Sequence, residues 1–219
     1  MTGEQLFFNW PTRVALGRDD FFVTDANASA YAMVSAPDSW PSGKLALIGP
    51  KASGKTHLAR VFAQMTGAVI LSAADLTDTT DTPRAGHVVV EDLQDLRPEG
   101  EEALFHLHNN LAGQGYLLLT ATIAPSRWSI ALPDLASRMQ GTAVARISDP
   151  DDQLLAAVIM KLFEDRQIAP TPGLVAYLSS RIERSFYAAQ DIVARLDAEA
   201  LSSGRKVNER LARALLEKD

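Results

Sequence analysis

The chain has 219 residues, of which 47% are hydrophobic and 22% charged, and it contains no cysteine. This composition supports a buried core and excludes disulfides and thiolate metal sites. The net charge of −6 argues against a surface that grips duplex DNA unaided, because such binding depends on Lys and Arg neutralising phosphates, although it leaves room for a local basic patch. Residues 1–11 lack the basic start and apolar run of a signal peptide, and no apolar run approaches the ~20 residues that span a bilayer, so we expect a soluble, cytoplasmic protein.

From Leu45 onward, short apolar runs alternate with helical patterns. This alternation is typical of parallel strands joined by crossover helices that cover both faces of a sheet. The sequence therefore predicts an α/β core with a five-stranded parallel sheet, in which segment 72–86, rich in Thr and Asp, is a loop. The predicted strands are 45–48, 68–71, 88–90, 116–119 and 144–147, and the predicted helices are 55–66 and 101–112.

The strand signals stop after Ile147, and the pattern then becomes helical. Apolar residues repeat with helical period over 154–163 and 186–200. A small helical domain of ~70 residues is therefore predicted after the sheet. Its predicted boundary residues are Ser148 or Asp149 as the first cap with Pro150 in the first turn, Thr171 and Pro172 at the next helix start, Gly204 at the end of a longer helix, and Asn208 as the last cap.

A phosphate-binding loop is predicted between the strand at 45–48 and the helix at 55–66. Its residues match the pattern G-x-x-x-x-G-K-[ST] in the strand-to-helix context that this pattern requires. Glycines let the backbone turn and aim N–H groups at phosphate oxygens, Lys55 can bridge the β- and γ-phosphates, and the Thr56 hydroxyl can bind Mg²⁺. The predicted nucleotide-binding residues here are Gly49, Pro50, Lys51, Ala52, Ser53, Gly54, Lys55, Thr56 and His57.

Two acids, Glu91 and Asp92, follow the strand at 88–90. They are placed to hold the Mg²⁺ shell, with Glu91 beside Thr56 as a predicted metal ligand, and to polarise water. The usual order is Asp first, and positioning a hydrolytic water is sensitive to ~1 Å misplacement. We therefore expect nucleotide binding with slow hydrolysis; the alternative is a pair of solvated acids after a strand.

Together these motifs resemble the AAA+ family, and within it the DnaA branch, over nearly the whole chain. The resemblance implies an AAA+ core at 13–148 with a five-stranded parallel sheet and P-loop, a small α-helical lid domain at 149–219, and bound ATP or ADP with Mg²⁺. Residues 20–23 with Asn27 are similar to the family's opening segment, so Phe22 and Val23 are implied to sandwich the adenine.

The resemblance also assigns three residues around the γ-phosphate. The stretch LPDLASR at 132–138 is similar to the one that carries the arginine finger, here Arg138; the alternative is a salt bridge at a helix end. Arg184, expected to open the long lid helix, falls at the second sensor arginine; the alternative is a solvated lid residue. Thr122 stands where the family has an acidic or amide first sensor, and a hydroxyl supplies no carboxylate, which again predicts slow turnover.

The N-terminal segment 1–12 contains Gln5, Leu6, Phe7 and Phe8. These residues resemble the short sliding-clamp-binding peptide of DnaA-related regulators, which lays bulky side chains into a surface pocket. An ordinary strand that packs on the core is the alternative.

DnaA-type initiators carry a helical insertion near 72–86 and a C-terminal helix-turn-helix domain, and we expect neither here, because the loop is short and the sequence ends after the lid at Asp219. The leading hypothesis is a regulator that binds ATP or ADP, docks on the sliding clamp and presents Arg138 to ATP held by DnaA, without direct sequence-specific DNA binding. The alternatives are a self-assembling AAA+ ATPase, active as a homo-oligomer, that loads or remodels a partner, and a nucleotide-gated DNA-binding initiator.

Overall fold

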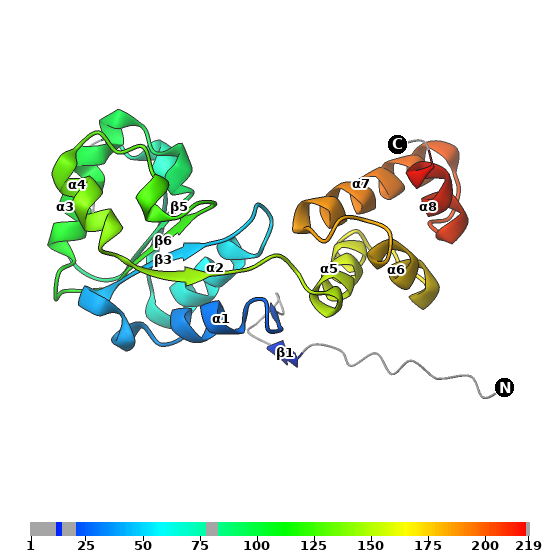
Figure 1. Cartoon of the computed structure of the whole chain (residues 1–219), viewed down its shortest axis with the longest axis horizontal. Coiled ribbons are helices and arrows are strands. Elements are labelled where there is room, and N and C mark those ends of the chain that lie inside the picture. The colour runs from blue at the N-terminus through cyan, green and yellow to red at the C-terminus, as the bar shows by residue number, and fades with distance from the viewer. Residues whose placement is uncertain (1–11, 15–20, 78–82, 218–219) are drawn as a thin grey trace. The chain divides into compact units, whose positions relative to one another are not determined.

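The computed structural model describes residues 12–14, 21–77 and 83–217. The chain divides into two compact units (Figure 1). We call Asn27–Ser148 the core unit, and we call Asp149–Asp219, together with the described residues before Asn27, the lid unit. In the described part of the chain, no helix is long and apolar enough to cross a membrane.

The core unit is built on a five-stranded sheet whose strand order is β4-β5-β6-β3-β7. All four strand pairs are parallel, which confirms the predicted architecture. Ile48 at the end of β3 pairs with Ala121 of β6 and with Arg146 of β7, so these three strands end at one edge of the sheet. The strands are β3 (Lys44–Ile48), β4 (Val69–Ser72), β5 (Val88–Glu91), β6 (Leu117–Ala121) and β7 (Ala143–Arg146).

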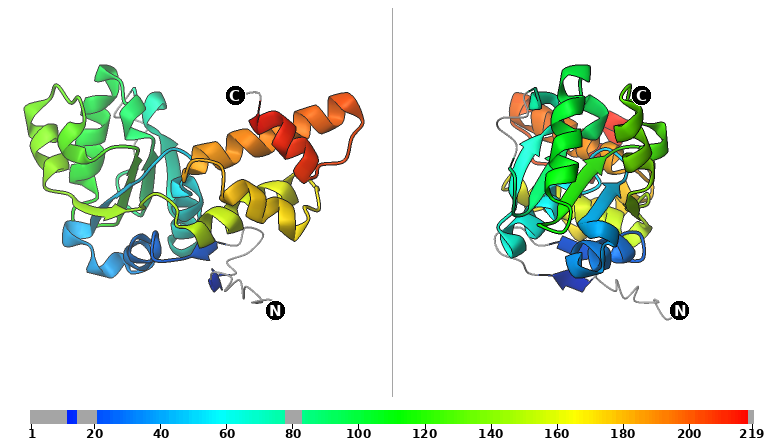
Figure 2. Two further views of the ribbon diagram at one scale, coloured as in Figure 1. Left: turned by 45° about the vertical axis from the view of Figure 1, so that its right-hand side comes forward. Right: turned by 90° about the vertical axis from the view of Figure 1, so that its left-hand side faces the viewer.

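Helices cover both faces of this sheet (Figure 2). Successive side chains of a strand point to opposite faces. Ala46 and Ile48 of β3 therefore join the apolar cluster that contains Leu104 of α3 (Glu101–Asn110) and Leu135 of α4 (Pro133–Gln140). On the other face, α2 (Lys55–Thr66) contacts β4, β5 and β6, while α1 (Ala28–Val34) contacts β3, β7 and α2.

The predicted strands and helices of the core unit lie within about two residues of the observed ones, but two core helices were missed. Helices α1 and α4 have 7 and 8 residues, which is too short for helical periodicity to stand out from the surrounding sequence. Segment 72–86 is largely irregular, as predicted, with a 3-10 turn at Ala73–Asp75; residues 78–82 fall outside the description.

The lid unit contains four helices around one apolar cluster. They are α5 (Asp152–Asp165), α6 (Pro172–Ser179), α7 (Phe186–Ser203) and α8 (Glu209–Leu216). Thr171 and Asn208 cap α6 and α8 through their side chains, and Gly204 ends α7 in the left-handed conformation, as predicted. The unit also contains an antiparallel pair, β1 (Thr12–Val14) and β2 (Phe21–Val23), that the sequence did not predict.

The predicted cap of α5 was wrong. Asp151, not Ser148 or Asp149, caps this helix, because its side chain accepts a hydrogen bond from the Leu154 amide at 2.7 Å. Pro150 consequently precedes the cap instead of lying in the first turn. The strand pairing explains the later start, since the Ile147 amide still donates to the Ile48 carbonyl at 2.8 Å and a residue before proline avoids the helical conformation.

Candidate nucleotide-binding site

The loop that joins β3 to α2 has the shape of an anion cradle. Ala52 and Gly54 both adopt the left-handed conformation, with φ of 66° and 91°, and backbone N–H groups beside such residues converge on one concavity. Gly54 is also the N-cap of α2 and provides no side-chain cap, so the first amides of the helix keep their hydrogens for a ligand. The predicted loop therefore has the backbone that phosphate binding needs.

Gly49 is required by close packing at the start of this loop. A Cβ atom at this position would lie 2.9 Å from the Ile147 Cβ and 2.9 Å from the Ser53 Oγ. The Gly49 amide donates to the Ala121 carbonyl of β6 at 3.2 Å. The glycine thus lets the loop leave the sheet between two neighbouring strand ends.

Lys55 folds back onto its own loop. Its Nζ donates to the carbonyl oxygens of Gly49 at 3.0 Å and Pro50 at 2.8 Å, and the side chain is buried. Burial lowers the pKa of Lys55, while the charges of Asp92 and Glu91 act in the opposite direction. The ammonium is therefore held at the loop, close enough to both acids to interact with their charges.

The acidic strand end lies beside a polar network that the sequence did not reveal. Asp92 adopts the left-handed conformation, with φ of 60°, and its amide donates to the Thr120 Oγ1 at 3.1 Å. Its carboxylate accepts a hydrogen bond from Gln94 Nε2 at 2.9 Å, and Gln94 Oε1 accepts one from the Thr122 amide at 3.1 Å. Gln94 therefore bridges the predicted acid at β5 to the predicted sensor position after β6.

Two buried oxygens at this edge have no hydrogen-bond partner among the described residues, Ser53 Oγ and Glu91 Oε1. Leaving such an atom unpaired costs about 1–3 kcal/mol, so both are open to a polar ligand or its metal ion. The structure brings the loop, Glu91, Asp92 and Thr122 together at the ends of three adjacent strands. Within the loop, Gly49, Ser53 and Lys55 are buried, Pro50, Ala52, Gly54 and His57 are half-buried, and Lys51 and Thr56 are exposed.

Arg138 lies away from this site. It is an exposed residue in the last turn of α4, with its guanidinium carbon 5.1 Å from the centre of the Phe105 ring, and it forms no ion pair with a described residue. Its positive charge helps to lower the pKa of Lys44, the first residue of β3, after burial. It also helps to lower the pKa of His108, in the last turn of α3, to about 4, again after burial and after the charge of Lys44.

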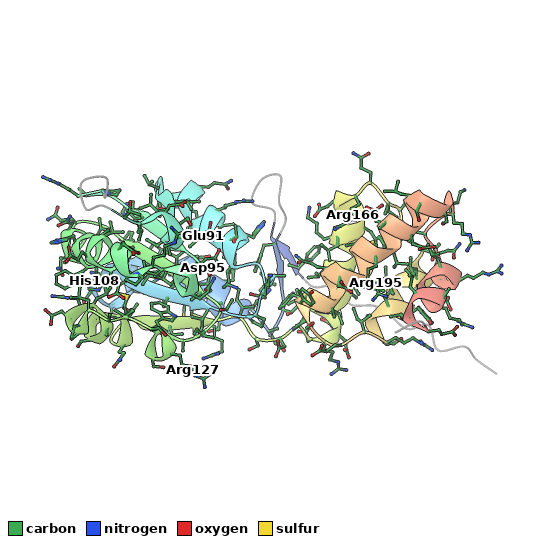
Figure 3. All side chains as sticks on the ribbon, turned by 90° about the horizontal axis from the view of Figure 1, so that it is seen from above. Glu91, Asp95, His108, Arg127, Arg166 and Arg195 are labelled. Atoms are coloured by element: carbon green, nitrogen blue, oxygen red, sulfur yellow. The ribbon has the colours of Figure 1, made fainter. Side chains whose placement is uncertain are left out.

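Arg138 lies at the amino end of the sheet, because its carbonyl accepts a hydrogen bond from Thr142 Oγ1 at 3.0 Å and the next residue, Ala143, pairs with Leu45 near the start of β3. The phosphate loop follows the carboxyl end of β3. A five-residue strand spans roughly 16 Å. Figure 3 shows Glu91, at the end of β5, and His108, in the last turn of α3, at different places in the core unit. Arg138 is therefore on the opposite edge of the sheet from the loop of its own chain.

Helix α3 holds the start of the helix that carries Arg138. The buried carboxylate of Glu101 accepts hydrogen bonds from the amides of Ala131 at 2.9 Å and Leu132 at 2.7 Å, immediately before α4. Phe105, one turn later, lies under the Arg138 guanidinium. Neither residue was predicted as part of the site, because only the folded chain brings positions ~30 residues apart into contact.

The remaining predicted residues belong to the lid unit or fall outside the description. Phe22 and Val23 are in β2, and Arg184 precedes the Ser185 cap of α7 instead of opening the helix as predicted. Arg184 forms a bidentate ion pair with Asp152, with Nε to Oδ1 at 2.8 Å and Nη2 to Oδ2 at 2.9 Å, and both side chains are exposed. The segment with Gln5 to Phe8 lies outside the described residues.

Known structures share this fold. Domain III of the replication initiation protein DnaA from Thermotoga maritima superposes with a TM-score of 0.72 and 19% identity, over 90% of this chain and 94% of that one. AMPPCP-bound DnaA from Aquifex aeolicus gives 0.64 and 17%, over 83% of this chain. A RuvB variant from Thermotoga maritima gives 0.61 and 17%, over 86% of this chain.

The chain spans 65% and 66% of the Aquifex aeolicus DnaA and RuvB chains, respectively. Among curated sequences, an uncharacterized protein of Haemophilus influenzae is 28% identical over 173 residues, which cover 73% of this chain and 75% of that protein. No protein-family model matches the chain. The core sheet and its helical C-terminal region are accordingly an AAA+ fold of the type seen in DnaA domain III.

Proposed function

We propose that this chain is a nucleotide-binding regulator of replication initiation, similar to Hda, that stimulates hydrolysis of ATP bound to DnaA while docked on the sliding clamp. The observation that carries the proposal is the place of Arg138, which is exposed, has no ion pair with a described residue, and lies at the sheet edge opposite its own phosphate loop. A guanidinium in that position is available to a nucleotide held by another molecule.

The proposal gives the phosphate loop a binding role. An incoming phosphate would replace the Gly49 and Pro50 carbonyls as the partner of Lys55, while the convergent amides and the N-terminus of α2 hold its oxygens. Thr56 and Glu91 would hold Mg²⁺, which neutralises charge on the phosphates when bound. ATP or ADP with Mg²⁺ fits these residues, including the buried oxygens of Ser53 and Glu91 that have no partner.

The residues around the acidic strand end support slow turnover in this chain. The Asp92 carboxylate accepts a hydrogen bond from the Gln94 side chain, and Gln94 also accepts one from the Thr122 amide. An acid committed to a side-chain amide is less free to orient water. Under the proposal the nucleotide of this chain sets its conformation and assembly, and the chemistry takes place on the ATP of DnaA.

The clamp enters the proposal through the N-terminal segment. Gln5 would donate and accept hydrogen bonds while Leu6, Phe7 or Phe8 fills an apolar pocket, as in peptides that anchor by a few buried side chains.

Arg184 would act as the second sensor by exchanging Asp152 for the γ-phosphate. This exchange costs little, because the ion pair is exposed and exposed ion pairs contribute little stability.

The test is the rate of hydrolysis of DnaA-bound ATP, with clamp on DNA, in the presence of wild type, Arg138→Ala and Arg127→Ala. Arg127 is the matched control, an exposed arginine of the same unit (Figure 3). Because arginine fingers contribute 10³–10⁵ in rate, the expected result is loss of stimulation with Arg138→Ala alone. Equal stimulation by both variants rules out the finger.

A self-assembling ATPase that remodels a partner is the alternative outcome. Such a protein needs its own turnover, whereas the proposed regulator does not. Phosphate release by the isolated chain at several per second, near the ~10 s⁻¹ typical of enzymes, would favour the remodeller.

A further inference from the structure

The turn between α7 and α8 is strongly basic, in contrast to the chain as a whole. Residues 205–213 contain four cations, Arg205, Lys206, Arg210 and Arg213, and one acid, Glu209, within a protein whose net charge is −6. The Glu209 carboxylate is already paired with Arg213, at 3.4 Å. The segment therefore keeps an excess of positive charge.

Three of these cations, Arg205, Lys206 and Arg210, line a groove of about 510 Å³. Its lining residues are Arg205, Lys206, Asn208, Arg210, Leu211 and Ala214. The three basic side chains are exposed, and none of them forms an ion pair with a described residue. Asn208 Oδ1 accepts a hydrogen bond from the Leu211 amide at 3.0 Å, which fixes the start of α8 and with it the backbone at one side of the groove.

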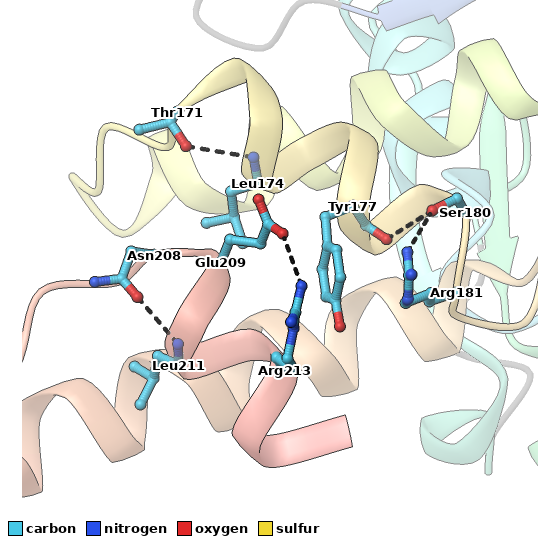
Figure 4. Close-up of polar contacts among 9 residues, drawn as sticks. All are labelled: Thr171, Leu174, Tyr177, Ser180, Arg181, Asn208, Glu209, Leu211 and Arg213. Atoms are coloured by element: carbon cyan, nitrogen blue, oxygen red, sulfur yellow. Dashed lines mark hydrogen bonds and ion pairs between the residues drawn. The ribbon is translucent and has the colours of Figure 1, made fainter. Parts of the chain in front are cut away.

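A further arginine, Arg181, lies in the turn after α6 and contacts Tyr177 of that helix. The guanidinium carbon of Arg181 lies 4.2 Å from the centre of the Tyr177 ring, and that of Arg213 of α8 lies 5.9 Å from it (Figure 4). Arg181 also donates to Ser180 Oγ at 3.3 Å. The Tyr177 ring therefore holds one further positive charge, that of Arg181, beside Arg213 of α8.

The lining of the groove selects the ligand class. No carboxylate of a described residue lines it, and Leu211 is only 6% exposed, so it offers no pocket for the apolar anchors that a peptide interface uses. It offers three cations that have no ion pair with a described residue, and two of them are guanidinium groups, which suit the oxygens of phosphates. The regularly spaced phosphates of a nucleic-acid strand could contact all three cations.

We propose that this basic groove binds the phosphodiester backbone of DNA without reading its sequence. The site is independent of the proposed regulatory function, because it uses neither the phosphate loop nor Arg138. If three cations each neutralise one phosphate of a duplex, the logarithm of the binding constant falls with the logarithm of the salt concentration with a slope of about −2.7. Binding then weakens roughly 40-fold between 50 and 200 mM salt.

The experiment measures the anisotropy of a labelled 20-base-pair duplex titrated with the full chain at several salt concentrations. The variants are Lys206→Ala and Arg210→Ala, and the matched control is Lys161→Ala. Lys161→Ala also removes one positive charge from the lid unit, but Lys161 lies on α5, where it forms an ion pair with Asp165 at 3.0 Å. The expected result is that each groove variant reduces the slope by about 0.9, whereas the control leaves it unchanged.

Two further measurements compare the duplex with single-stranded DNA and with an acidic peptide. A single strand of the same length should bind with a slope of about −2.1, and an unlabelled polyglutamate peptide of equal charge should compete less well than DNA. The melting temperatures of the variants should match that of wild type, since the replaced side chains are exposed. No binding at 50 mM salt, equal effects of Lys206→Ala and Lys161→Ala, or stronger competition by the peptide would each overturn the proposal.

Discussion

Replacing Glu101 tests how the helix that carries Arg138 is held. This carboxylate is buried, with 6% exposure, and accepts hydrogen bonds from the amides of Ala131 and Leu132. Glu101→Ala removes the charged acceptor of both amides. A hydrogen bond to a charged group contributes about 1.5–3 kcal/mol, so the two together predict a loss of ~3 kcal/mol or more in the free energy of unfolding.

Urea unfolding measures this loss, followed by the fluorescence of Trp40 and Trp128, which both lie in the core unit. With m of roughly 2 kcal/mol/M, the midpoint should fall by about 1.5 M. Glu102→Ala is the matched control, because it removes an exposed acid from the next position of the same helix and such changes stay within ~0.5 kcal/mol. Equal midpoints for the two variants would refute the reasoning.

Three other predictions follow from the site. Lys55→Ala should weaken ADP binding roughly 10- to 100-fold in calorimetric titration, because a charged hydrogen-bond donor is lost; an unchanged affinity in a folded variant would remove the loop from the site. The pKa of His108 is lowered to about 4 in the folded chain, so below pH 6.5 His108 binds a proton in the unfolded chain before it does so in the folded one. The free energy of unfolding should therefore decline between pH 6.5 and 4, by at most about 1.4 kcal/mol per pH unit. His108→Asn should flatten that decline and His106→Asn, at an exposed position, should not; the reverse would contradict the assignment. The double variant Gln5→Ala, Leu6→Ala should melt like wild type yet bind the clamp roughly 30-fold more weakly; earlier melting would instead identify a structural strand.

The features that could be predicted from the sequence are those encoded locally. The strand, the Gly49 to Thr56 loop and the helix after it follow one another directly, so a short pattern defined both the loop and its context. The helix caps Thr171 and Asn208 were likewise readable, because a cap and its amide partner lie three residues apart. Three possible caps, Ser148, Asp149 and Asp151, lie within four residues before α5, so the local signal was ambiguous and the predicted cap was wrong.

The features that could not be predicted depend on contacts across the fold. Gln94 reaches the Thr122 amide over 28 positions, and Glu101 reaches Leu132 over 31. Nothing in the composition of either segment marks such a pair. The distance between Arg138 and its own phosphate loop also required the sheet, because it depends on which end of β3 each element packs against.

The central claim is that Arg138 acts on a nucleotide held by another molecule. The most direct measurement loads DnaA with ATP labelled at the γ-phosphate, loads this chain with unlabelled ADP, and follows release of labelled phosphate in a single turnover with clamp on DNA. We expect the wild-type chain to accelerate release by 10³-fold or more and Arg138→Ala to leave it unaccelerated. Release that is unchanged by the wild-type chain, or equally fast with Arg138→Ala, would contradict it.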